Sequence, residues 1–110
     1  MNIENIAHEN KEQFSDEFLR WLPENAHIWM AFEQEAFKVV RAGFKHYSAR
    51  TIIHVLRHHS ALSERGDGGW KINNNISPYL ARLFAILNPN LADLFEYRTA
   101  HRALRDGVTR

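Results

Sequence analysis

Residues 26–59 read AHIWMAFEQEAFKVVRAGFKHYSARTIIHVLRHH and contain two helical patterns that meet at a glycine. In the first pattern, apolar side chains recur every three or four residues, which predicts a helix from about 26 to 42 with one buried face. The residues on or beside that face are Ile28, Trp29, Phe32, Ala36, Val39 and Val40. Gly43 ends this helix, because glycine readily adopts the positive φ found at helix ends.

A second helix is predicted from Ser48, a favourable N-cap residue, to about 59. Its apolar residues are Ala49, Ile52, Ile53 and Leu56. Two helices joined by a short glycine turn are typical of a helix-turn-helix unit. Small or branched apolar residues expected six and nine positions after the glycine are present as Ala49 and Ile52, whereas the alanine expected four positions before it is replaced by Val39.

The segment after this pair predicts a small β-hairpin. Residues 65–69 read RGDGG, the chain's glycine cluster and a clear turn signal. Trp70, Lys71 and Ile72 alternate apolar and polar, as in a strand with Trp70 and Ile72 facing the core, and 61–63 is the expected partner strand. The order helix, turn, helix, hairpin is winged-helix-like.

The flanking sequence completes a mainly α fold of about five helices with one small β-hairpin. We expect a loosely ordered lead-in over 1–13, a helix capped by Ser15 and ended by Pro23, and a helix begun by Ser77 and Pro78. The last of these has an apolar stripe, and a brief final helix follows it; their apolar residues are Leu80, Leu83, Phe84, Leu87, Leu91, Leu94 and Phe95. The predicted organisation is one globular domain over 14–98, with 99–110 as a basic tail or helix extension.

Composition excludes several classes of protein. The chain has 110 residues and no cysteine, which rules out disulfides, thiolate zinc sites and cysteine nucleophiles. No segment approaches the roughly 20 apolar residues that a membrane span needs. The start of the chain has no secretory pattern, so we expect a cytoplasmic protein.

Charge is unevenly distributed along the chain. Residues 1–35 contain eight acidic and two basic side chains, whereas 36–63 contain five basic and no acidic ones. A local basic field of this kind favours a polyanionic partner, with DNA as the leading candidate. In a helix-turn-helix mode, the second helix presents its first polar residues to base edges and nearby cations contact phosphates. The predicted nucleic-acid contacts are Lys38, Arg41, Lys45, Arg50, Thr51 and His54.

Other constellations have plain structural explanations. His54 and His58 are four residues apart and could share a metal, but a zinc site needs further ligands and exposed histidines are the simpler explanation. We expect no metal, no cofactor and no enzymatic activity, since neither a nucleophile elbow nor a phosphate-binding loop is present. Residues 73–75, three asparagines, could cap a helix, form a turn or face a ligand. Arg82 or Arg57 is expected to pair with Glu96.

A resemblance adds a biological setting. The runs WKINNN at 70–75 and SPYLARLF at 77–84 resemble a group of small bacterial and prophage-type proteins to which no activity is assigned. The resemblance covers about residues 18–98 and is echoed at 25–29, Gly43, 48–57, Pro89 and 95–98. It implies a bacterial or phage origin but no mechanism.

The alternative function is non-enzymatic protein interaction, for example a phage-encoded modulator of a host protein. Helical hairpins serve many purposes besides reading DNA. A host protein or a second copy in a homodimer would then contact exposed aromatic residues, for which Trp21, Trp29 and Tyr47 are the candidates.

Overall fold

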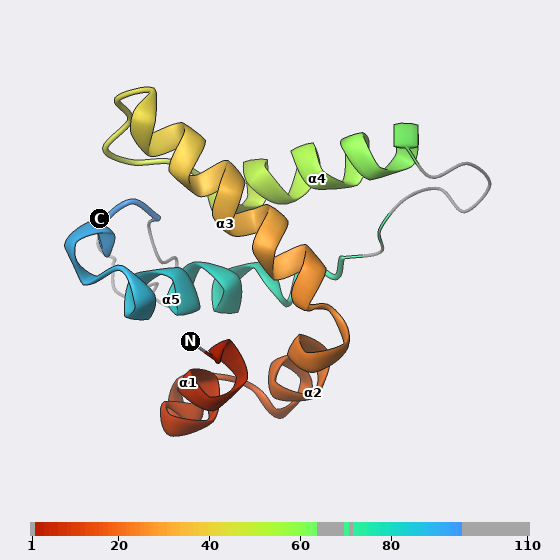
Figure 1. Cartoon of the computed structure of the whole chain (residues 1–110), viewed down its shortest axis with the longest axis vertical. Helices are drawn as coiled ribbons and strands as arrows, with labels where there is room; N and C mark the ends of the chain where they lie inside the picture. The colour runs from red at the N-terminus through yellow and green to blue at the C-terminus, as the bar shows by residue number, and fades with distance from the viewer. Residues whose placement is uncertain (1, 64–69, 71, 96–110) are drawn as a thin grey trace, which may run out of the picture.

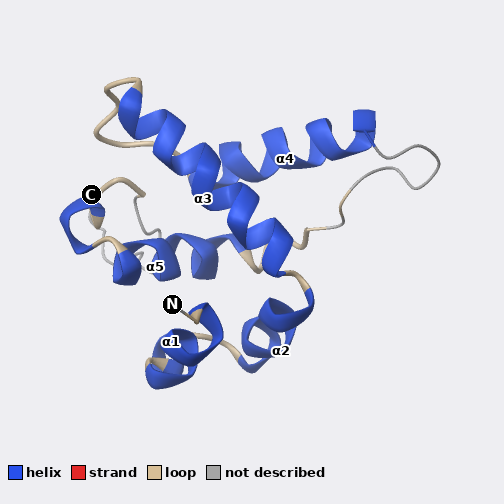
Figure 2. Ribbon diagram, viewed as in Figure 1, coloured by secondary structure: helices blue, strands red, loops and turns tan. Residues whose placement is uncertain are grey.

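The computed structural model describes residues 2–63, 70 and 72–95, and this part of the chain is mainly helical, as predicted (Figures 1 and 2). Five α-helices and two short 3-10 helices follow one another. Their bounds are α1 (Ile3–Glu9), η1 (Lys11–Gln13), α2 (Asp16–Glu24), α3 (Ala26–Arg41), α4 (Ala49–Ser63), α5 (Ser77–Leu87) and η2 (Pro89–Leu91). The described residues form no β-sheet, only an isolated parallel bridge between Tyr47 and Phe95.

Helix α3 is central to the fold and contacts α2, α4 and α5 (Figure 1). Helices α1 and α2 pack together at one end, and α4 lies at the other. The predicted apolar faces point inward: Ile28, Phe32 and Ala36 of α3 are buried, as are Ile52, Ile53 and Leu56 of α4 and Leu80, Leu83 and Phe84 of α5. Burial of these side chains is the main stabilising contribution to such a helical fold.

An aromatic cluster joins α3, α5 and the segment after α5. The ring of Phe95 lies 5.4 Å from that of Phe32 and 5.5 Å from that of Phe84, and Trp29 stacks beside Phe32 at 6.0 Å. Leu94 and Phe95 therefore belong to the core, but not as part of a helix. The predicted brief final helix is wrong beyond Leu91, because the carbonyl of Leu94 accepts a hydrogen bond from the Tyr47 N–H (2.7 Å) and the chain extends beside Tyr47.

Local sequence signals fix two of the helix starts as predicted. The Ser15 hydroxyl accepts a hydrogen bond from the Phe18 N–H, and the Ser48 hydroxyl accepts one from the Thr51 N–H. Ser77 behaves differently from the prediction: it is the first residue of α5, and its hydroxyl donates to the carbonyl of Asn74 instead of capping the helix. The turn formed by the three asparagines supplies that carbonyl.

Gly43 ends α3 as predicted, with φ at +98°. Its N–H donates to the Val40 carbonyl (3.0 Å) and the Phe44 N–H donates to the Val39 carbonyl (3.3 Å). These two bonds form a Schellman motif, which satisfies carbonyl groups that the end of a helix leaves unpaired.

Two short helices, α1 and η1, lie within the segment predicted as a lead-in. The Asn2 side chain caps α1, and Ala7 is fully buried. Phe14, at the end of η1, is also buried and stacks on Phe18 of α2 with ring centroids 5.2 Å apart. These tertiary contacts order a segment in which the sequence shows no sustained helical period.

The predicted partner strand of the hairpin is wrong, because 61–63 belongs to α4. The helix continues through Ser60, whose buried hydroxyl donates to the Arg57 carbonyl and accepts from the Trp70 N–H (2.8 Å). Ile72 is buried and Trp70 half-buried, so both apolar residues face inward as expected. The glycine cluster at 65–69, Lys71 and the segment 99–110 lie outside the described residues.

Candidate nucleic-acid interface

The six residues predicted to contact nucleic acid are exposed and lie along one continuous stretch of chain. Lys38 and Arg41 lie in the last turn of α3, and Lys45 lies in the turn 42–48. Arg50, Thr51 and His54 lie in the first turns of α4. The polar face of α4 thus points to solvent while its apolar face packs against α3 and α5.

The surface formed by these residues contains no carboxylate from its own segment, because 36–62 includes neither aspartate nor glutamate. Among the described residues, the acidic residues Glu35 and Asp93 contact it directly. Glu35 forms an ion pair with Lys38 (Nζ to Oε2, 2.9 Å), and the carbonyl of Asp93 lies 3.2 Å from Nδ1 of His46. Lys38 is therefore partly neutralised, and the free positive charge is concentrated on Arg41, Lys45 and Arg50.

The turn between the two helices departs from the predicted helix-turn-helix unit. Residues 42–48 separate α3 from α4, a longer link than the three or four residues usual in such units. The extra length has a physical cause: after the Schellman motif, the chain extends so that Tyr47 can pair with Leu94 and Phe95. Only then does Ser48 start α4.

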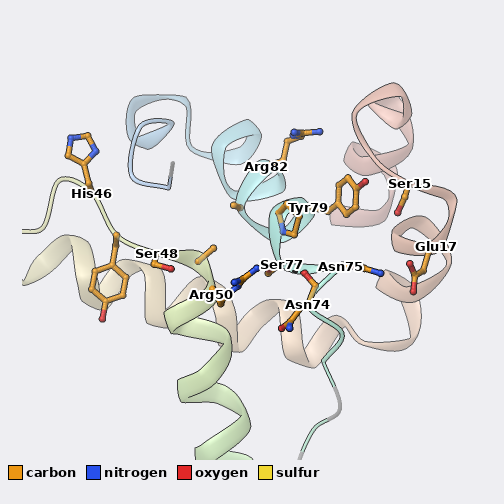
Figure 3. Close-up of a pocket in the computed structure, with 14 residues that line it drawn as sticks. Ser15, Glu17, His46, Ser48, Arg50, Asn74, Asn75, Ser77, Tyr79 and Arg82 are labelled. Atoms are coloured by element: carbon orange, nitrogen blue, oxygen red, sulfur yellow. Dashed lines mark hydrogen bonds between the residues drawn. The ribbon is translucent and has the colours of Figure 1, made fainter. Parts of the chain in front are cut away.

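Arg50 also lines a pocket of about 890 Å³ with a mixed polar and apolar lining (Figure 3). The pocket is bordered by the starts of α2, α4 and α5, and its lining includes Ser48, Asn74, Ser77 and Arg82. Figure 3 shows the Arg50 side chain extending from the start of α4 toward Ser77 and Asn74, with His46 and Glu17 at opposite ends of the view.

Two properties of this pocket suit an anion. Within the described residues the Arg50 guanidinium has no ion-pair or hydrogen-bond partner, and Glu17 is the single acidic side chain of the lining. A guanidinium binds phosphate or carboxylate oxygens through two parallel N–H donors. The pocket could therefore hold a phosphate group next to the first turn of α4.

The remaining arginines near the pocket have structural partners. Arg82 donates to the carbonyl of Gln13 (2.9 Å) and lies over the ring of Tyr79, with 5.8 Å between Cζ and the ring centroid. Arg57 donates to the carbonyl of Ile72 and to the Asn74 side chain. Glu96, the partner predicted for either arginine, lies outside the described residues.

The asparagines at 73–75 build the turn before α5. Oδ1 of Asn73 accepts from the Asn75 N–H (2.8 Å), and Oδ1 of Asn74 accepts from Arg57 (2.9 Å). Both contacts stabilise the backbone around the turn. Of the three predicted roles for these asparagines, they therefore support turn formation. The side chain of Asn75 lines the pocket.

The exposed apolar residues differ from those proposed for a protein partner. Trp29 is buried in the core, with 2% of its surface exposed, so its predicted role on the surface is wrong. Trp21 and Tyr47 are half-buried. In the described part of the chain, the large apolar side chains that are exposed are Met30, Phe44 and Leu62. The exposure of Phe44 was not predicted, because an apolar side chain is expected to be buried. Its position between Gly43 and Lys45, in a turn, is the sequence feature that indicates exposure.

Histidines 54, 58 and 59 are exposed on α4. Across residues 2–63, 70 and 72–95, histidine, aspartate and glutamate side chains nowhere gather in a group of three that could hold a metal ion. No helix within these same ranges is both long enough and apolar enough to span a membrane.

Comparison with known proteins finds no matching family model, no similar curated protein and no similar solved structure. The resemblance to small bacterial and prophage-type proteins therefore stays a prediction.

Proposed function

We propose that this chain is a small nucleic-acid-binding module, with DNA as the leading partner, and that it binds through the end of α3, the turn 42–48 and the start of α4. The observation that supports the proposal is the exposure of Arg41, Lys45 and Arg50 on a segment without carboxylates. Phosphate neutralisation by such cations supplies most of the sequence-independent affinity for DNA.

The proposed mode gives different tasks to different residues. Arg50 and Thr51, in the first turn of α4, would contact base edges or the phosphate nearest the pocket, and His54 would extend this contact one turn further. Arg41 and Lys45 would bind phosphates and set the orientation of the chain without reading sequence. We keep the helix-turn-helix arrangement of α3 and α4 as part of this proposal. A wing with 61–63 as one of its strands is not proposed, because these residues are helical.

The experiment that tests the proposal is a mobility shift with mixed-sequence duplex DNA at two salt concentrations. We expect binding that weakens steeply with salt. Arg50→Ala should cost about 1–3 kcal/mol and relax sequence preference if Arg50 reads a base, whereas Lys45→Ala should weaken all sequences similarly. Arg20→Ala is the matched control, because Arg20 is an exposed arginine of α2 outside this surface. Absence of binding to any nucleic acid at low salt would contradict the proposal.

Protein interaction is the second candidate, and one specific observation favours it. Leu62, in the last turn of α4, is 71% exposed, and a protein partner that covered this apolar side chain would gain free energy that a polyanion would not. In this case the partner would be a host protein or a second copy of the chain. Sedimentation of the purified protein over a range of concentrations tests the second form directly, with Leu62→Ser expected to dissociate a dimer.

A further inference from the structure

The turn 42–48 presents an aromatic ring within a positively charged surface. Phe44 is 52% exposed, and the side chains of Arg41, Lys45 and His46 around it in the sequence are exposed as well. A single exposed apolar side chain is common on protein surfaces, so what distinguishes Phe44 is the cations that flank its ring.

The ring is held in place by the turn that carries it. The Phe44 N–H is bonded to the Val39 carbonyl in the Schellman motif, and the Phe44 ring meets Tyr47 edge-on at 5.2 Å and 70°. The backbone of Tyr47 is anchored in turn, because its N–H donates to the Leu94 carbonyl. A side chain that is already ordered loses little conformational entropy when a ligand binds.

We propose that Phe44 is a stacking platform for an unpaired nucleic-acid base, while Arg41 and Lys45 bind the adjoining phosphates. This inference rests on the proposed nucleic-acid function and deepens it by naming the form of the ligand: single-stranded, looped or unstacked nucleic acid. Aromatic side chains interleaved with cations are the usual means of binding single strands, because every base offers a π-face. Within a duplex those faces are stacked on one another and cannot reach the ring.

The charges around the ring favour this partner over an apolar protein surface. Arg41 and Lys45 have no ion-pair partner within the described residues, and a polyanion would supply one for each. The acidic residue that adjoins the turn, Asp93, contacts it through its backbone carbonyl to His46. A protein partner would instead need carboxylates placed around an apolar contact.

The test compares a labelled short oligothymidine with a duplex of the same length, measuring affinity by fluorescence anisotropy at one salt concentration. Phe44→Ala and Phe44→Leu should weaken binding to the single strand by about 5- to 150-fold, the range that loss of one base–aromatic stack produces. Phe44→Tyr should keep most of the affinity, because it keeps the ring. Met30→Ala is the matched control: Met30 is also exposed (56%) but lies toward the opposite end of α3.

The outcomes separate this inference from the proposed function. If the protein binds the duplex and Phe44→Ala does not weaken binding to the single strand, the stacking role is overturned. The proposed function would then still stand. Loss of affinity in Phe44→Ala but not in Phe44→Leu would also overturn it, since it would reveal a general apolar contact such as a protein partner makes. If no nucleic acid binds, both fall. Thermal unfolding of each variant verifies that the fold is retained.

Discussion

Tyr47 and Phe95 form a parallel β-bridge that ties the turn between α3 and α4 to the segment after α5. The Tyr47 N–H donates to the neighbouring Leu94 carbonyl at 2.7 Å, while the Phe95 ring inserts between Phe32 and Phe84. The position of the exposed ring of Phe44, which rests on Tyr47, therefore depends on a core residue far away in the sequence. Packing and candidate function are linked through this bridge.

The first prediction concerns that core residue. Phe95→Ala should lower the free energy of unfolding by about 3–5 kcal/mol, because it removes a buried ring and leaves a cavity. Phe44→Ala makes the same chemical change at an exposed position and should cost only about 0.5 kcal/mol. Urea unfolding measures both, with Phe95→Leu as a milder variant. Equal losses at 95 and 44 would mean that Phe95 does not have the described packing.

Gly43 gives a second prediction, one that depends on backbone conformation. Its φ of +98° disfavours any residue with a Cβ, yet a Cβ built there would meet no atom within 4 Å. Gly43→Ala should therefore destabilise the protein through strain alone, by about 1–2 kcal/mol. Gly43→Asn should cost less, because asparagine tolerates positive φ better than alanine. An alanine variant as stable as the parent in thermal unfolding would show that the turn adopts another conformation.

The sequence predicted those parts of the fold that local interactions determine. Caps at Ser15 and Ser48, the glycine at the end of α3 and the apolar faces of three helices depend on neighbours within a few residues. It failed at 61–63 and at Leu94 and Phe95. Those segments are decided by partners distant in sequence: Trp70 reaches Ser60, and Tyr47 reaches Leu94.

The candidate site was predictable to a similar extent. Exposure of Arg50, Thr51 and His54 follows from the apolar residues that alternate with them in α4. The ion pair of Lys38 with Glu35 could have been found from their spacing of three residues on a helix. The pocket beside Arg50 could not, because it is bordered by three helices whose relative positions depend on tertiary packing.

A third prediction tests the contact between α4 and the asparagine turn. Arg57 satisfies the carbonyl of buried Ile72 and the side chain of Asn74. Arg57→Ala should destabilise the protein by about 1–3 kcal/mol, because a buried carbonyl then lacks a donor. Arg41→Ala, which removes an exposed arginine without a partner within the described residues, is the control and should change stability little. Urea unfolding distinguishes them, and similar stabilities would contradict the bridging role of Arg57.

The last prediction uses the Lys38–Glu35 pair to test the electrostatics of the proposed interface. Glu35→Gln releases Lys38 from its 2.9 Å partner, so nucleic-acid affinity should rise and its salt dependence should steepen by up to about 0.9 in the slope of log K against log salt. Glu33→Gln removes the same charge two residues earlier from a glutamate that has no ion-pair partner within the described residues, so it reproduces only the long-range part of the effect.

In the parent protein Lys38→Ala should reduce the slope less than Lys45→Ala, because Lys45 is exposed and unpaired. In the Glu35→Gln background the two lysine substitutions should become equivalent, since both cations are then free to meet a phosphate. Titrations at three or more salt concentrations give the slopes. Identical behaviour of Glu33→Gln and Glu35→Gln would place Lys38 outside the interface and confine the contact surface to the turn and the start of α4.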